Sequence, residues 1–458
     1  MVEYGVAPLN LGLTTGLCEY LASLRFSDLR AEVVHASRRG LLDWVGCALA
    51  GSTHATVDKL VGVLEAVSDT RRGTVIGRNE RLGCLEAALA NGVMGHVLDY
   101  DDTHMQGVIL HTSSPVLAAL FSLAETGEGV SGEEFVAAYV AGFEAGVRAG
   151  RAAPGHHRGG WHLTGTLGSI AAAAACGRLL NLDAQQMTHA LGIGATQAAG
   201  MQQNRGTMCK SLHAGKAAQN GALAALLARQ GFTSSPEILE GRKGFCRIYS
   251  NVAETEHIVQ GLGERWEITS NGFKPYACGV VMHPAIDAMI ALRQKSAGAT
   301  FDEIELRVNA LAVSVTGVSD PSSGLQSKFS LRHSAAVAFL DGAAGMSQYT
   351  DARAKSRDVQ DFGAKLSIVT DASYQTDQAS GRMWIGGTEL DVRVDHATGT
   401  RDNAMSDAAL ESKFRMNAAT VLSAERIDAL RDGLWSLEKL KDVRELLPLC
   451  ANKSPNPG

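Results

Sequence analysis

The sequence has few aromatic residues, few prolines and no long apolar run. Aromatic residues make up 5% of the 458 residues, and ten residues are proline. No stretch reaches the roughly 18 to 20 apolar residues of a membrane span, and residues 1–16 lack the basic start and apolar core of a secretory signal. Because 48 acidic residues offset 42 basic ones, there is no basic excess of the kind that nucleic-acid-binding proteins show. We therefore expect neither membrane insertion nor nucleic-acid binding.

The cysteines show no disulfide or metal pattern, and the common cofactor motifs are absent from the sequence. Eight cysteines are scattered without a C-x-x-C pair, and several, such as Cys47 and Cys176, lie in apolar surroundings. This favours a reduced, cytoplasmic protein whose cysteines are small buried hydrophobic residues. Gly192 and Gly194 are followed by Gln197 where a dinucleotide-binding motif requires a third glycine. The sequence also lacks a P-loop, a G-x-S-x-G motif and a zinc signature.

Glycine is the residue in excess, with fifty in the chain, above the roughly 7% that is usual. From about residue 16 to 268 the apolar residues recur every three or four positions, which predicts helices. Several of these runs end at glycine, and three are rich in alanine and glycine, which lets helix axes approach closely. Ser131 with Glu134 predicts a capping box, and Asp183 predicts another helix start. We expect no strand in this part of the chain.

The pattern changes near Asn271. Between residues 301 and 315, Ile304, Leu306 and Val308 alternate with polar residues, which predicts a strand. Residues 365–369 and 390–394 repeat this alternation, and residues 284–294 and 334–340 have helical spacing. Helical spacing returns after residue 400, including 424–446 behind a Ser423 cap.

These patterns predict a mainly α protein with an inserted α+β domain. Residues 1–270 and 401–458 would form one discontinuous all-helical domain, and residues 271–400 the inserted domain. A cleft between two such domains is a common place for a small-molecule site.

The densest group of ionisable residues lies in residues 98–115. Besides Asp99 it contains two further carboxylates, one threonine and two histidines: Asp101, Asp102, Thr103, His104 and His111. Such groups are unfavourable to bury without a purpose. A solvated turn explains them equally well, and a metal site stays open although no ligand spacing is recognisable.

Two further groups stand at predicted helix starts. His162 precedes a glycine- and threonine-rich start that favours an anion, whereas His156 and His157 fit a solvated loop. Arg205 and Lys210 form a basic group with His213 and Lys216. The group suggests carboxylate binding, and a buried lysine could act as a base. Ordinary helix caps and solvated charges are the alternative in both places.

Two groups lie at the entrance to the inserted region and within it. Lys274, Tyr276 and His283 stand in a Pro- and Gly-containing segment at the inferred hinge, where a plain linker is the alternative. Arg332 and His333 precede an apolar helix, where capping is the simpler interpretation.

Taken in order, these motifs resemble one known family. LDYDDTH with HTSSP, WHLTGTLGSIAAAA, CKSLHAGKAAQNGALAA, KPYACGVVMHPAIDA and KFSLRHSAAVAFLDG occur in one order over about residues 10–445. The sequence is similar to the MmgE/PrpD family. The resemblance implies a large all-helical domain, a smaller α/β lid, a homodimer, no metal and no organic cofactor. It also implies removal of a proton next to a carboxylate of a small di- or tricarboxylate.

The resemblance and the motifs together give a candidate site. The expected catalytic residues are Asp99, His162 and Lys210, with His162 or Lys210 as the base. The expected substrate-binding residues are Thr103, His104, His111, Arg205, Lys274, Tyr276, His283 and His333.

Two positions depart from the family's cis-aconitate decarboxylase. Gly279 stands about where that enzyme has a catalytic histidine, and His333 where it has a tyrosine. Both speak against cis-aconitate decarboxylation and leave the reaction open. Because 2-methylcitrate dehydratase is the activity most common in the family that the sequence resembles, we expect a 2-methylcitrate dehydratase-like lyase first. The alternatives are an epimerase of an amino- or imino-dicarboxylate such as iminodisuccinate, and a non-catalytic carboxylate-binding paralogue.

Overall fold

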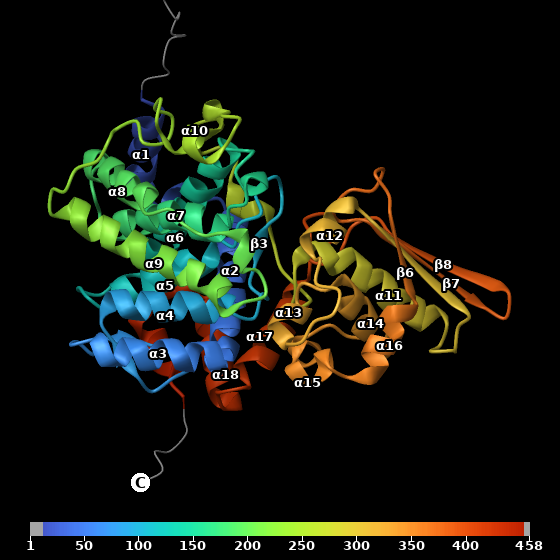
Figure 1. The fold of residues 1–458 in the computed structure, drawn as a ribbon. Coiled ribbons are helices and arrows are strands. Elements are labelled where there is room, and N and C mark those ends of the chain that lie inside the picture. The colour runs from blue at the N-terminus through green and yellow to red at the C-terminus, as the bar shows by residue number, and fades with distance from the viewer. Residues whose placement is uncertain (1–11, 453–458) are drawn as a thin grey trace, which may run out of the picture.

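The chain folds into two lobes of unequal size. The computed structural model describes residues 12–452, so the first eleven and last six residues of the expected helical domain lie outside the described residues. Figure 1 shows a larger helical lobe beside a smaller lobe that carries the main sheet. Each lobe has a hydrophobic core, and the core of the smaller lobe extends to Cys47, Ala50 and Tyr100 of the larger one. The expected boundaries at residues 271 and 400 stay a prediction.

The larger lobe consists of helices from both ends of the chain. Its helices are α1 (Leu13–Ser23), α2 (Ala31–Gly51), α3 (Ala55–Val67), α4 (Cys84–His96), α5 (Ser113–Ala124), α6 (Gly132–Arg151), α7 (Leu163–Leu179), α8 (Ala184–Thr196), α9 (Met208–Arg229), α10 (Phe245–Tyr249), α17 (Asp407–Ala418) and α18 (Ala424–Trp435). The capping box of Ser131 and Glu134 and the Asp183 cap are both present. Helical periodicity therefore predicts this lobe well.

Glycine allows the central helices to touch through their backbones. A Cβ atom added at Gly215 of α9 would lie 2.3 Å from the carbonyl oxygen of Leu89 in α4, and one at Gly92 would lie 2.8 Å from Gly215 Cα. These distances are shorter than van der Waals contact. The close approach sets α9 against α4, and these two helices carry Lys210 and His96.

Replacing Gly215 with alanine should therefore push α9 away from α4. Overpacking of this kind typically costs about 1 to 3 kcal/mol, so we expect a lower melting temperature and, because Lys210 moves, a lower turnover. Gly62→Ala in α3 is the matched control, because nothing lies within 4 Å of the added Cβ. An equal melting temperature for the G215A and G62A variants would contradict this packing.

The C-terminal part of the chain returns to the larger lobe. The ammonium of Lys413 in α17 lies 2.6 Å from Asp43 Oδ1 in α2 and 2.6 Å from the Tyr100 carbonyl. The single helix expected over residues 424–446 is wrong, because α18 ends at Trp435 and 3-10 turns follow. There the backbone N–H of Val443 donates to Val130, which a continuous helix would prevent. The Ser423 side chain also makes no capping hydrogen bond.

The smaller lobe packs helices against a four-stranded sheet. The strands are β5 (Glu303–Val308), β6 (Leu366–Thr370), β7 (Ala379–Ile385) and β8 (Thr388–Val394), in the order β6-β5-β7-β8, with only β5 and β6 parallel. The helices are α11 (His283–Lys295), α12 (Ala310–Val315), α13 (Gly324–Ser327), α14 (Leu331–Asp341), α15 (Asp351–Ala354) and α16 (Arg357–Lys365). Figure 1 shows the hairpin of β7 and β8 at the far end of this lobe.

The structure corrects the predicted strands in three respects. The strand expected to run to Val315 ends at Val308, because the Asn309 side chain accepts from Leu311 N–H and starts α12. Strand β7 was not predicted; its central Gly381 packs against Leu292 of α11 and interrupts the alternation of large apolar residues. Short strands β1 to β4, of two residues each, also occur where none was expected.

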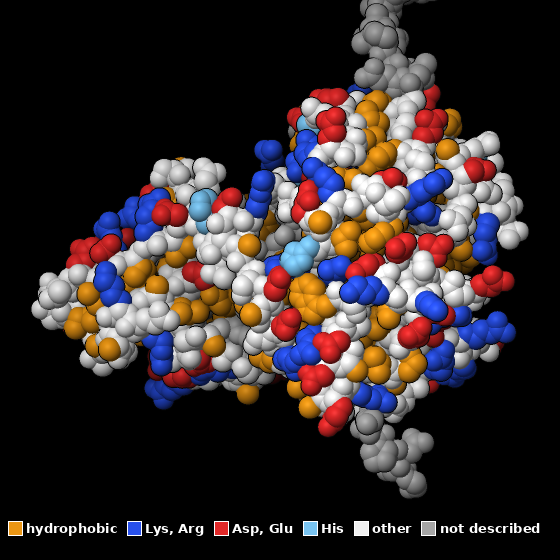
Figure 2. Space-filling view, turned by 180° about the vertical axis from the view of Figure 1, so that it is seen from behind, with side chains coloured by type: hydrophobic (Ala, Val, Ile, Leu, Met, Phe, Trp, Pro, Cys, Tyr) orange, Lys and Arg blue, Asp and Glu red, His pale blue; other side chains and the backbone are white. Residues whose placement is uncertain are grey.

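The described residues also answer the expectations about membrane helices, cysteines and surface charge. No helix among residues 12–452 combines the length and apolarity needed to cross a bilayer. Six of the eight cysteines are buried, Cys84 is half-buried, and Cys209 is exposed against expectation. Figure 2 shows basic and acidic side chains interspersed over one face rather than gathered by sign.

Candidate active site

A short antiparallel pair brings the acidic loop beside the chain that enters the smaller lobe. The loop after α4 leads into β3 (Thr103–His104), which pairs with β4 (Asn271–Gly272), with Thr103 opposite Gly272. Lys274 therefore lies next to Asp99. Its ammonium lies 2.5 Å from Asp99 Oδ1 and 3.1 Å from the Asp99 carbonyl oxygen. Both contacts hold Asp99 in a left-handed conformation, with φ of 51°, which few non-glycine residues adopt.

A second lysine approaches Asp99 from the first turn of α9. The Lys210 ammonium lies 3.2 Å from Asp99 Oδ2. Burial alone would raise the pKa of Asp99, but Lys210 and Lys274 outweigh it and hold the pKa well below its usual value. Burial lowers the pKa of Lys210 despite the opposing attraction of Asp99. The site thus contains an ionised carboxylate and a lysine that gives up its proton more readily than a solvated one.

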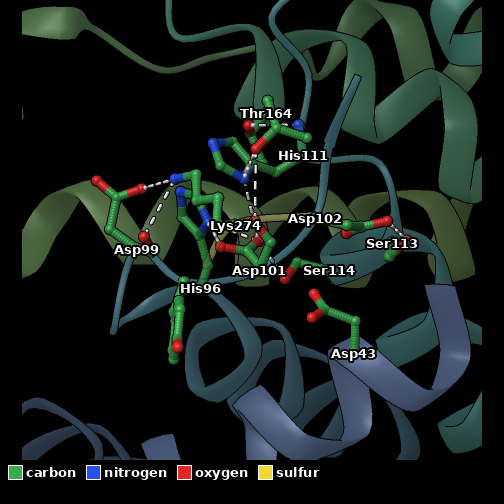
Figure 3. Close-up of polar contacts among 12 residues, drawn as sticks. Asp43, His96, Asp99, Asp101, Asp102, His111, Ser113, Ser114, Thr164 and Lys274 are labelled. Atoms are coloured by element: carbon green, nitrogen blue, oxygen red, sulfur yellow. Dashed lines mark hydrogen bonds and ion pairs between the residues drawn. The ribbon is translucent and has the colours of Figure 1, made fainter. Parts of the chain in front are cut away.

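Lys210 also ends a buried chain of hydrogen bonds. Its Nζ lies 3.1 Å from His96 Nε2, and His96 Nδ1 lies 2.9 Å from Asp101 Oδ2. Burial lowers the pKa of His96 to about 4, so its ring is neutral near pH 7. With its one proton on Nδ1 facing the Asp101 carboxylate, Nε2 can accept from the Lys210 ammonium. Figure 3 shows His96 and Asp101 side by side below Lys274 and His111.

Two more histidines complete the polar wall. His111 Nδ1 lies 3.1 Å from the Thr103 hydroxyl, and its ring meets that of His96 edge-on at 4.6 Å between centroids. His162 stands at the start of α7, and its Nδ1 lies 2.9 Å from His213 Nδ1. Burial, with Lys210 nearby, lowers the pKa of His162 well below its usual value. His162 is therefore neutral, and its Nε2 is the ring nitrogen available to a substrate.

These groups border a cavity of about 60 Å³ between the two lobes. The larger lobe supplies Asp99, Ile109, His111, His157, His162, Arg205 and Lys210; the chain from residue 271 onward supplies Lys274, Gly279, Val280, Val281, Leu311, Val315 and Phe329. The lining carries three basic side chains and one carboxylate. Its charge favours an anionic ligand.

The structure brings together six of the eleven expected site residues. The cavity is lined by Asp99, His111, His162, Arg205, Lys210 and Lys274. Thr103 lies behind them as a hydrogen-bond partner of His111.

The other four expected residues are not among those that line the cavity, and their expected role in substrate binding stays a prediction. His104 is buried with its Nδ1 on the Val108 carbonyl. The Tyr276 hydroxyl donates to Asp287, and His283 packs against the Tyr276 ring. His333 Nε2 contacts the Gln348 carbonyl, and the residue borders a separate hollow.

Sequence reasoning missed several residues of the site. His96 lies at the end of an apolar helix, and its only signal was its position five residues before Asp101. His157, expected in solvent, lines the cavity and lies 3.2 Å from Arg205. His156, also expected in solvent, is buried against Phe245 and Tyr249.

The buried histidines should make the protein acid-sensitive. Neither ring nitrogen of His156 has a hydrogen-bond partner, and burial lowers the pKa of His156 to about 3, against about 6.5 in an unfolded chain. Between these pH values the unfolded state binds the extra proton. The free energy of unfolding should therefore fall by about 1.4 kcal/mol per pH unit for this residue as pH drops below about 6.5. Urea titrations of the wild type and His156→Phe between pH 4 and 7 measure how much His156 contributes to this pH dependence. An equally steep fall of the free energy of unfolding with pH in the variant would contradict the prediction.

One group among residues 12–452 has the geometry to hold a metal ion. The ligand atoms of His96, Asp101 and His111 lie within 4.8 Å of one another. The same atoms already satisfy one another and Thr103 by hydrogen bonds, so the donor set does not require an ion. We expect activity to survive exhaustive chelation, as measured by turnover and bound-metal analysis. Loss of activity that zinc, manganese or iron restores would contradict this expectation.

Comparison with known proteins gives one consistent result. The MmgE/PrpD N-terminal domain matches residues 15–257, and the MmgE/PrpD C-terminal domain matches residues 276–437. Cis-aconitate decarboxylase from Aspergillus terreus is 29% identical over 97% of this chain and 97% of its own. The cis-aconitate decarboxylase-like protein oryM from Aspergillus oryzae is 27% identical over 96% and 98%. Human cis-aconitate decarboxylase is 26% identical over 97% and 95%. These relatives support a lyase and give no support to the expected epimerase alternative or to the dehydratase in particular.

Proposed function

Since the chain belongs to the MmgE/PrpD family, we propose that it is a lyase that acts on a small di- or tricarboxylate. The observation that carries this proposal is the pair of lysines on Asp99. Lys210 and Lys274 contact its two carboxylate oxygens inside a cavity that Arg205 also lines. Such a set can hold substrate carboxylates and the negative charge that develops next to them.

The protonation states assign different roles to Lys210 and His162. Lys210, hydrogen-bonded to His96 and paired with Asp99, is the proton donor. His162 is neutral and is the acceptor that takes a proton from carbon. Lys274, Arg205 and His111 bind carboxylates. Asp99 keeps both lysines in place.

Two lyase reactions use these roles. In decarboxylation, the bond to one carboxylate breaks, its electron pair moves into a neighbouring carboxylate, and Lys210 protonates the carbon as CO2 leaves. In dehydration, His162 removes the proton next to a carboxylate, and Lys210 protonates the departing hydroxyl. The names of the relatives favour decarboxylation. Dehydration stays a candidate because Gly279 lines the cavity without an ionisable group, where the family resemblance leads us to expect a histidine in a decarboxylase.

We propose further that the smaller lobe acts as a lid. It supplies Lys274 and most of the apolar lining, so closure completes the site and excludes water. Small-angle X-ray scattering should show a smaller radius of gyration when a bound carboxylate saturates the site. An unchanged radius with demonstrated binding would contradict the lid. The expected homodimer and cytoplasmic location stay predictions.

A panel of small carboxylates tests the proposed function. Purified protein is incubated with citrate, 2-methylcitrate, isocitrate, cis-aconitate and iminodisuccinate, and products are followed by proton NMR and CO2 release. New alkene signals with CO2 identify a decarboxylase, and new alkene signals without CO2 identify a dehydratase. Inversion without loss of mass, or binding without turnover, would overturn the lyase proposal.

A further inference from the structure

The cavity lining is of two kinds. Besides the basic and histidine side chains it includes six apolar ones: Ile109, Val280, Val281, Leu311, Val315 and Phe329. Four of these, Ile109, Val280, Leu311 and Val315, are only half-buried, so part of their apolar surface is not covered by protein. A substrate that consists only of carboxylates and hydroxyls would leave this surface against water.

The apolar part of the lining continues out of the cavity. Ile109, Val280, Val281 and Leu311 also border a second, larger hollow of about 330 Å³. The rest of that hollow is mostly polar and includes His396, paired with Asp377, and Arg401, which reaches Gln106. We call the four shared apolar residues the neck. The neck joins a charged inner cavity to a polar outer hollow.

The charges of the inner cavity limit the number of carboxylates that it balances. Asp99 already occupies one face of Lys210 and Lys274, and Arg205 is the third basic group in the lining. Three basic groups and one carboxylate leave a net charge of about +2 when all four are ionised. This charge suits a substrate that places two carboxylates in the inner cavity. The remainder of such a substrate would carry no charge.

We propose that this remainder is an alkyl chain, longer than methyl, on a carbon next to a substrate carboxylate, and that the chain lies in the neck. The proposal rests on the proposed function and names its substrate class, an alkyl-substituted polycarboxylate. The carboxylates bind the basic side chains of the lining, and the chain extends between Ile109, Val280, Val281 and Leu311 toward the outer hollow.

A homologous series tests the proposal. Citrate and cis-aconitate are compared with their 2-methyl, 2-ethyl, 2-propyl and 2-butyl derivatives. Each methylene that enters the neck should raise kcat/KM about threefold to fourfold, which corresponds to about 0.8 kcal/mol. Turnover of the series with a flat or falling kcat/KM would overturn the chain proposal and leave the lyase standing. No turnover of any member would overturn both.

Two variants locate the chain, and one serves as a control. Leu311→Asn should flatten the increase of kcat/KM with chain length, and Val280→Phe should fill the neck and reverse the preference toward the shortest substrate. Val313→Asn is the control on the same helix, because Val313 is 39% exposed and borders neither hollow. An unchanged chain-length preference in both neck variants, or the same loss in V313N, would overturn the assignment of the chain to the neck.

Discussion

Replacing Lys210 with methionine should lower kcat by at least about a hundredfold, which is the lower range for loss of a general acid or base. Methionine keeps most of the side chain's volume and removes the ammonium that lies 3.1 Å from His96 Nε2 and 3.2 Å from Asp99 Oδ2. Both lyase reactions proposed above need this proton donor. Steady-state kinetics on the best substrate of the panel measure the effect.

Lys216→Met is the matched control for this variant. Lys216 lies on the same helix, is exposed, and contacts only Gln219 among the described hydrogen bonds. We expect wild-type turnover from K216M. Melting temperatures of both variants within a few degrees of the wild type would show that the helix is intact, and wild-type kcat from K210M would remove Lys210 from the mechanism.

The pH profile gives an independent check of the Lys210 role. A donor must carry its proton, so kcat should fall as pH rises through the pKa of Lys210. Because burial lowers that pKa, the decline should begin below the value of about 10.4 that is usual for lysine. The K210M variant should lack this limb of the profile.

Replacing Asp101 with asparagine should lower kcat by about a hundredfold without removing any group that touches the substrate. The Asp101 carboxylate holds the single proton of neutral His96 on Nδ1, so that Nε2 accepts from Lys210. An amide offers both a donor and an acceptor, so it no longer selects this tautomer. Wherever Nε2 carries the proton, it repels the Lys210 ammonium. Asp101 is thus a positioning residue that acts through His96.

The readout for D101N separates positioning from simple destabilisation. Loss of an acceptor at His96 disfavours the ammonium, so the basic limb of the kcat profile should move to lower pH. Asp102→Asn is the control: burial raises the pKa of Asp102 well above its usual value, which favours the neutral carboxyl that an amide replaces with little change. We expect D102N to keep its pH profile. A D101N variant that folds normally and keeps both kcat and the basic limb would contradict the hydrogen-bonded chain.

Local patterns predict the helices but not every partner in the site. The spacing of apolar residues identified the helical lobe, and alternation identified β5 because Ile304, Leu306 and Val308 face one core. Alternation could not show that Asn309 ends the strand, since a side-chain cap depends on one hydrogen bond. Strand β7 was missed because Gly381 replaces a large apolar residue where α11 packs.

For the site, too, motifs predicted some residues but not the contacts that bring them together. Asp99, Lys210 and Lys274 were expected from motifs, but their meeting depends on the pairing of Thr103 with Gly272 and on the contact of Gly92 with Gly215. These contacts join residues far apart in the chain, so no local pattern reveals them. His96 was missed for the same reason. His104, Tyr276, His283 and His333 were expected in the site but do not line the cavity, because a motif does not tell where a side chain points.

Solvent-deuterium uptake tests the proposed chemistry most directly. The best substrate of the panel is turned over in deuterated water by the wild type, K210M and K216M, and the products are examined by NMR and mass spectrometry. For decarboxylation, we expect one deuterium at the carbon that loses CO2, formed by the wild type and K216M and at least about a hundredfold more slowly by K210M. For dehydration, the remaining substrate should gain deuterium next to a carboxylate. Alkene formation by K210M should again be at least about a hundredfold slower than by the wild type. Product formation by K210M at the wild-type rate would contradict the proposal that Lys210 supplies the proton in this site.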